Sequence, residues 1–156
     1  MPRRPSGDLA ARGGPPHLRP AYLGLVFLGG MAGTLARFGL AEAIPTHAGL
    51  PLGIFSINLA GAFALGLLLD ALAQRGPDEG RRRALRLFLG TGFLGGFTTY
   101  SALAVDSALL LGSGRTAEGV TYLVGSVLLG LAAAAGGIMV ASRIRRLPSD
   151  ASGAAP

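Results

Sequence analysis

Four long apolar stretches make up most of the chain, over residues 21–43, 52–72, 87–112 and 120–142. At about 1.5 Å rise per residue, a helix of about 20 residues crosses a hydrocarbon core about 30 Å thick. Apolar residues surround each predicted helix instead of forming one stripe, which is typical of helices that face lipid. The pattern therefore predicts an all-α integral membrane protein with four transmembrane helices.

The composition supports this class. Half of the 156 residues are hydrophobic and 14% are charged, against about 25% charge in soluble domains. There is no Cys, which excludes a disulfide scaffold and a thiolate metal site. The chain has no Walker phosphate-binding loop and no paired titratable groups near one site, so we expect neither a pump nor an enzyme. Residues 1–20 and 143–156 are predicted to be cytoplasmic tails, the first of them basic and disordered, around a four-helix membrane domain at 21–142.

The arginines are distributed very unequally between the two sides of the predicted membrane domain. Of the 14 basic residues, all arginine, only Arg115 lies in a connection on one side and only Arg37 lies within a span. The others lie on the opposite side: Arg3, Arg4, Arg12, Arg19, Arg75, Arg81, Arg82, Arg83, Arg86, Arg143, Arg145 and Arg146. Positively charged loops stay in the cytoplasm, so both termini are predicted to be cytoplasmic and the orientation to be single. The run 81–83 could also bind nucleic acid or lipid headgroups, but in so short a loop we favour a topological role and expect no nucleic-acid partner.

Polar residues within the predicted spans are candidates for function, because polar groups at membrane depth are costly. Asn58 could bond another helix or donate to a bound anion. Arg37 could reach the membrane interface or supply positive potential to a vestibule. Asp70 is expected to reach the interface or to meet an Arg, and Asp106 to line a vestibule or form a pair.

The third span contains the strongest local signal, Gly92-Phe93-Leu94-Gly95-Gly96-Phe97-Thr98-Thr99-Tyr100-Ser101. Gly disfavours a helix by about 1 kcal/mol relative to Ala, and Thr and Ser offer the backbone alternative partners. One interpretation is a close-packing face, because Gly92 and Gly96 form a G-x-x-x-G pair. The other is a helix broken at mid-membrane near Gly95-Gly96, with free backbone groups for ions. The residues alone leave both open.

Three segments together resemble the Fluc (CrcB-type) fluoride channels: GGMAGTLARFG at 29–39, LGIFSINLAGAFALG at 52–66 and GTGFLGGFTTYSAL at 90–103. The resemblance implies an antiparallel dual-topology dimer with two fluoride pores in the bacterial cell membrane. It also implies a structural Na⁺ at the dimer centre, held by the backbone carbonyls of Gly95 and Thr98. It thereby favours the broken third helix.

The same resemblance assigns the pore to Asn58, Tyr100, Ser101 and Leu103, and gives Arg37 and Thr99 vestibule or structural roles. The chain departs from the family pattern where Leu103 replaces an aromatic ring, which would turn its positive edge toward fluoride. Tyr100, Ala102 and Ile54 are further departures. At least one pore lined by these residues is expected to be altered or inactive.

The charge bias and the altered pore have one common explanation. A dual-topology homodimer needs copies in both orientations, whereas this chain is biased toward one. We therefore expect a fluoride-exporting channel subunit that pairs with a related, oppositely oriented chain. A non-conducting structural partner is the alternative. A small proton-coupled drug exporter is disfavoured, because the first span has no carboxylate except Glu42 at its outer end.

Overall fold

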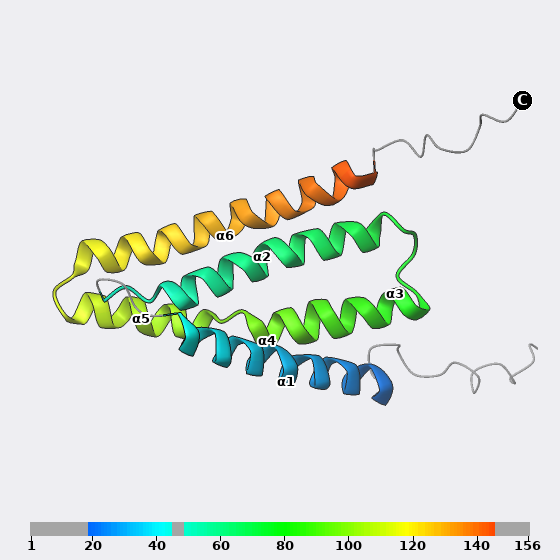
Figure 1. Cartoon of the computed structure of the whole chain (residues 1–156), viewed down its shortest axis with the longest axis horizontal. Coiled ribbons are helices and arrows are strands. Elements are labelled where there is room, and N and C mark those ends of the chain that lie inside the picture. The colour runs from blue at the N-terminus through cyan, green and yellow to red at the C-terminus, as the bar shows by residue number, and fades with distance from the viewer. Residues whose placement is uncertain (1–18, 45–48, 146–156) are drawn as a thin grey trace, which may run out of the picture.

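The computed structural model describes residues 19–44 and 49–145, and it is helical over nearly all of them (Figure 1). The elements are α1 (Pro20–Ala43), α2 (Leu52–Ala73), α3 (Gly80–Leu85), the π-helix η2 (Arg86–Leu94), α4 (Gly95–Phe97), α5 (Tyr100–Gly112) and α6 (Thr116–Arg145). Helices α3 to α5, with η2 between them, follow one another as a single span over Gly80–Gly112. The four predicted transmembrane helices are thus confirmed. Most of the two predicted tails lies outside the described residues.

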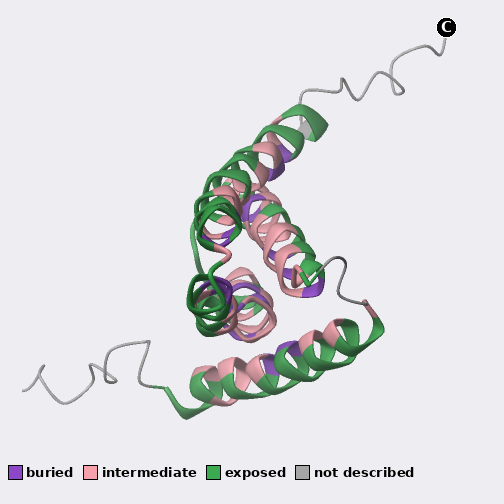
Figure 2. Cartoon of the chain, turned by 90° about the vertical axis from the view of Figure 1, so that its left-hand side faces the viewer, coloured by how far each residue is buried: buried purple, intermediate pink, exposed green. Residues whose placement is uncertain are grey.

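The four spans pack in two groups, and the third span takes part in both. Helix α2 packs along α6, α5 packs against the first part of α6, and α1 packs against η2 and α4. Figure 2 shows α1 on the far side of the third span from α6. The start of α1, the α2–α3 connection and the end of α6 lie at one end of the molecule (Figure 1). This is the end that carries the described arginines other than Arg37 and Arg115, so the sorting by side is confirmed for these residues. Arg3, Arg4, Arg12 and Arg146 lie outside the described residues.

Glycines allow the closest helix contacts. Gly92 of η2 faces α1, and a Cβ built there would lie 2.8 Å from the Val26 carbonyl oxygen. Gly137 of α6 faces α2, and a Cβ there would lie 2.7 Å from the Leu67 amide nitrogen. Such distances leave no room for a side chain, and small residues are the usual means of close packing in a bilayer. The close-packing interpretation of Gly92 is therefore confirmed.

The surface of the single chain is apolar on many sides. Phe27 and Leu131, on α1 and α6, are 67% and 69% exposed. Among the described residues, Ile57 of α2 is the one large side chain that is fully buried. These outward apolar side chains are suited to lipid or to a second membrane-embedded subunit.

Candidate functional site at the break in the third span

The third span is interrupted at Thr98 and Thr99, where the backbone becomes extended. Thr98 has φ −80° and ψ 155°, and Thr99 has φ −148° and ψ 120°. The expected position of the break at Gly95-Gly96 is wrong, because both glycines remain helical within α4. The threonines interrupt the helix because their hydroxyl groups bond the backbone. Thr98 Oγ1 donates to the Leu94 carbonyl at 3.0 Å, and Thr99 Oγ1 accepts from the Ala102 amide at 3.3 Å.

The four backbone carbonyls of residues 95–98 lose their helical donors at this break, and two of the lost bonds can be traced to new partners. In a continuous α-helix the Thr99 amide would bond the Gly95 carbonyl, and the Ala102 amide would bond the Thr98 carbonyl. The Thr99 amide instead donates to Asn58 Oδ1 at 2.7 Å, and the Ala102 amide to Thr99 Oγ1. The carbonyls that lose these two bonds are those of Gly95 and Thr98, the residues to which the resemblance assigns Na⁺ binding. Carbonyl oxygens are hard ligands that suit an alkali cation, so these two carbonyl groups are suitable ligands for Na⁺.

Asn58 of α2 replaces part of the missing helical bonding. Its Nδ2 donates to the Thr99 carbonyl at 3.0 Å, while its Oδ1 accepts from the Thr99 amide. The expectation that Asn58 bonds another helix is confirmed. An amide nitrogen carries two N–H donors, and the second makes no hydrogen bond to any described residue. One donor therefore stays available at the break.

Arg37 of α1 also reaches the break. Its Nε donates to the Gly96 carbonyl at 3.2 Å, and Thr34 Oγ1 donates to the same oxygen at 3.4 Å. Arg37 therefore points toward the break and not toward the membrane interface. Sequence reasoning missed Thr34, although it lies three residues before Arg37 and so shares its helix face.

Thr99 acts as the N-cap of α5, and its removal gives a direct prediction. Thr99→Val keeps the shape of the side chain but removes the acceptor for the Ala102 amide and the 3.2 Å contact with Ser101 Oγ. We expect the free energy of unfolding in detergent to fall by about 1 kcal/mol, the usual value of a lost cap. Thr91→Val is the matched control, because Thr91 is exposed on the same span and makes no side-chain hydrogen bond. Equal losses in the two variants would contradict the capping role.

The remaining predicted pore residues differ in their exposure. Tyr100 is 77% exposed in the first turn of α5, and Ser101 beside it is also exposed. Leu103 is 6% exposed and packs in a cluster with Leu110 and Tyr122. The structure therefore brings Asn58, Thr99, Tyr100 and Ser101 together at the break, while Leu103 lies in the core between α5 and α6.

The two aspartates within the spans, Asp70 and Asp106, lie away from the break. Asp70 accepts hydrogen bonds from Gln74 and, at 3.0 Å, from Ser142 Oγ of α6. Of the two alternatives expected for Asp70, pairing with an Arg is not seen among the described residues, where Asp70 forms no ion pair. Gln74 was detectable in the sequence, since it lies four residues after Asp70, whereas Ser142 was not. Asp106 lines a hollow of about 450 Å³ that Arg115 also lines, and its Oδ2 has no hydrogen-bond partner among the described residues.

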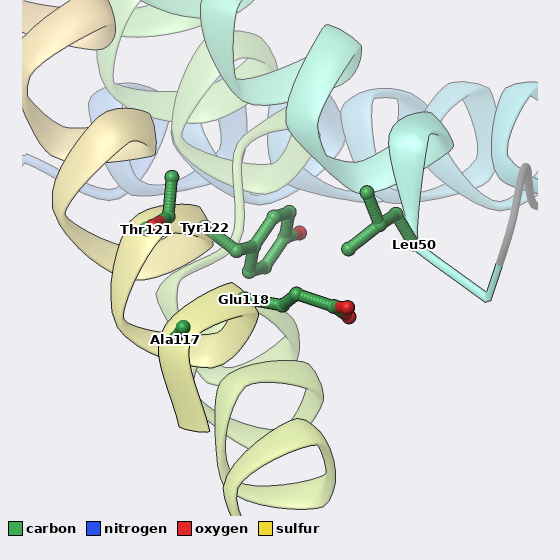
Figure 3. A pocket seen from close by; sticks show the side chains of 5 residues that line it. All are labelled: Leu50, Ala117, Glu118, Thr121 and Tyr122. Carbon is green, nitrogen blue, oxygen red and sulfur yellow. The ribbon is translucent and has the colours of Figure 1, made fainter. Parts of the chain in front are cut away.

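A further hollow, of about 280 Å³, lies where α6 begins, opposite the arginine-rich end of the molecule (Figure 3). Its lining comes from Leu50, Ala117, Glu118, Thr121 and Tyr122. Figure 3 shows the Tyr122 ring between α6 and the segment before α2, and the Tyr122 hydroxyl donates to the Pro51 carbonyl at 3.4 Å. This contact ties α6 to the start of α2 and adds no polar group to the break.

Known proteins resemble the chain over its whole membrane domain. The family of CrcB-like proteins, described as Camphor Resistance (CrcB), matches residues 24–138. The "Fluoride-specific ion channel FluC 2" of Leifsonia xyli subsp. xyli is 50% identical over 130 residues, 83% of this chain and 90% of the relative. "Fluoride-specific ion channel FluC 1" of Cutibacterium acnes is 52% identical over 123 residues, 78% and 86% of the two chains. "Fluoride-specific ion channel FluC" of Paracoccus denitrificans is 46% identical over 116 residues, 74% and 90%. The chain is therefore a multi-pass membrane protein that belongs to the CrcB family, a family of ion channels and not of enzymes.

Proposed function

We propose that this chain is a subunit of a fluoride-selective channel through which cytoplasmic fluoride leaves a bacterial cell passively, which reduces fluoride toxicity. The observation that carries this proposal is the unused Asn58 N–H at a helix break in the membrane. The relatives named as fluoride-specific channels support the choice of ion. Fluoride is small and strongly hydrated, so a pore must replace its water with hydrogen-bond donors.

The residues at the break supply such donors in positive surroundings. The N-terminus of α5 begins at Tyr100 and carries the positive end of its helix dipole. Broken transmembrane helices direct such ends at anionic ligands in other membrane proteins. Asn58 contributes an N–H, Ser101 contributes a hydroxyl, and the Tyr100 ring contributes its positive edge. The guanidinium of Arg37, fixed on the Gly96 carbonyl, adds positive potential close by.

The Gly95 and Thr98 carbonyls are proposed to hold a structural Na⁺ at the dimer centre. When bound, the ion would supply a fixed positive charge and join the two breaks of a dimer. The residues of this chain prepare the site, because Asn58 and the Thr99 hydroxyl divert the two amides that would otherwise occupy these carbonyls. The same diversion holds the break open without the ion.

The proposed assembly is an antiparallel dimer of this chain with a related chain of opposite charge bias. Apart from Arg37 within α1 and Arg115 at the opposite end, the described arginines gather at one end of the helices. Such a bias favours insertion in one orientation, with both termini in the cytoplasm. Tyr100 and the apolar side chains of α1 are exposed in the single chain, as expected of surfaces that a partner covers. The numbered names FluC 1 and FluC 2 suit organisms with more than one such chain.

A non-conducting structural subunit is the second candidate function. Leu103 favours it, because it lacks an aromatic ring and is buried in the core of its own subunit. In that case the partner chain would line the working pore with its own residues. This chain would contribute its carbonyls to the shared ion site.

Fluoride efflux from liposomes tests these proposals. The chain would be reconstituted with the related chain from the same organism, and the release of fluoride and of chloride followed with ion-selective electrodes. We expect rapid fluoride release from the pair, little chloride release, and no release with this chain alone. Fluoride release by this chain alone would contradict the heterodimer. Unchanged release by a pair that carries Asn58→Asp in this chain would favour the structural subunit.

A further inference from the structure

A shallow groove of about 270 Å³ lies at the arginine-rich end of the molecule, away from the break. It is lined by Leu25 of α1 and by Arg81, Ala84, Leu85 and Phe88 of α3 and η2. Four of these five residues are apolar, and Leu85 is 45% exposed. The groove thus combines an apolar floor with a single charged group.

Arg81 differs from the arginines next to it in the sequence. Arg82 donates to the carbonyls of Pro77, at 3.0 Å, and of Arg75. Asp78 pairs with Arg83 at 3.6 Å and with Arg86 at 2.7 Å. The hydrogen bond from Arg86 lowers the pKa of Asp78, so this carboxylate stays ionised. Within the described ranges, Arg81 has neither a hydrogen bond nor an ion pair. Its charge is therefore available to a ligand.

The lining residues are ordered by depth in the membrane. Arg81 is the second residue of the third span, which begins at Gly80. Ala84, Leu85 and Phe88 follow at three, four and seven positions, the spacing of one helix face. At about 1.5 Å per residue, Phe88 lies about 10 Å deeper than Arg81. The charge therefore lies near headgroup level and the apolar floor extends toward the acyl chains.

We infer that this groove is a binding site for one anionic phospholipid of the cytoplasmic leaflet. The phosphate of the headgroup pairs with Arg81, and one acyl chain lies against Leu25, Leu85 and Phe88. Basic pockets between helices at the cytoplasmic side are the usual places for such headgroups. Arg82, Arg83 and Arg86 are bound to groups of their own loop, which leaves Arg81 as the arginine that pairs with the phosphate.

Native mass spectrometry of the full chain, as purified with its partner subunit, tests this site. Phosphatidylglycerol and phosphatidylcholine with identical acyl chains serve as probes, with glycerol 3-phosphate as the soluble headgroup alone. We expect preferential binding of one phosphatidylglycerol, and Arg81→Gln should weaken it about five-fold, the value of one arginine near the surface. The matched control is Arg75→Gln, because Arg75 is exposed on the connection just before α3 and does not line the groove. Ala84→Trp should fill the groove and remove the bound lipid without any change of charge.

Three results would overturn the inference. Equal effects of Arg81→Gln and Arg75→Gln would mean that only the overall surface charge attracts the lipid. Equally strong binding of glycerol 3-phosphate would mean an anion site without a role for the acyl chain. A change of subunit stoichiometry in Ala84→Trp, with lipid binding retained, would mean that a protein surface occupies the groove.

Discussion

Asn58→Asp should reduce fluoride efflux through the channel by about 100-fold, because a carboxylate about 5 Å from the anion repels it by about 3 kcal/mol at an effective dielectric constant of about 20, and about 1.4 kcal/mol corresponds to a factor of ten. Asn58 donates through Nδ2 to the Thr99 carbonyl and accepts through Oδ1 from the Thr99 amide. An aspartate keeps only the acceptor half of this pair. Its second oxygen would face the Thr99 carbonyl as a like partial charge, and its negative charge would repel the anion.

A second variant separates the electrostatic effect from the structural one. Asn58→Leu removes both hydrogen bonds but adds no charge. We expect it to lower the free energy of unfolding, since it leaves the Thr99 amide and carbonyl without their partner. If Asn58 binds the anion and also stabilises the break, Asn58→Asp should reduce fluoride efflux more than Asn58→Leu does, when the two variants are equally stable. Undiminished efflux in Asn58→Asp would remove Asn58 from the pore.

Gly33→Ala should have the largest effect on the fold. A Cβ at Gly33 would lie 2.8 Å from the Phe93 carbonyl carbon and 2.9 Å from the Phe97 amide nitrogen. Both are backbone atoms, which cannot rotate away as the end of a side chain can. Helix α1 would have to withdraw from η2 and α4, and Arg37, one turn further along α1, would lose its bond to Gly96. We expect a loss of about 3 kcal/mol in the free energy of unfolding, the upper range for an overpacked core.

The same helix offers matched controls for this substitution. Gly24 and Gly39 also lie in α1, and a Cβ at either would meet nothing within 4 Å. Alanine should therefore be tolerated at both positions and should add up to about 1 kcal/mol through helix propensity. The comparison would be made by reversible unfolding of the three variants in detergent. Similar stabilities of Gly33→Ala and Gly39→Ala would contradict the close contact of α1 with the third span.

The class of the protein could be predicted from the sequence because membrane insertion depends on local properties. The length of an apolar stretch decides whether it spans, and the position of Arg decides which end it favours. Neither depends on which helix packs against which. The four spans and the gathering of Arg75 and Arg81–Arg86 at one end were therefore predictable from the residues alone.

The candidate site was only partly predictable, because backbone partners at a break are chosen in three dimensions. The run of Gly and Thr showed that the third helix is weak, but the position of the break depends on Asn58, which is 41 residues away from Thr99 in the sequence. The hydrogen bond between Arg37 and Gly96 also joins residues far apart in the sequence, as does the one between Asp70 and Ser142.

The sequence by itself thus determined that this is a helical membrane protein of four spans with one side rich in arginine. The tertiary structure decided where the third span opens and which carbonyls lose their amides. It also decided that Leu103 is buried while Tyr100 faces outward. The physical reason is that hydrophobic length and charge act on each segment separately, whereas an unsatisfied backbone group in a bilayer must find a partner on another helix.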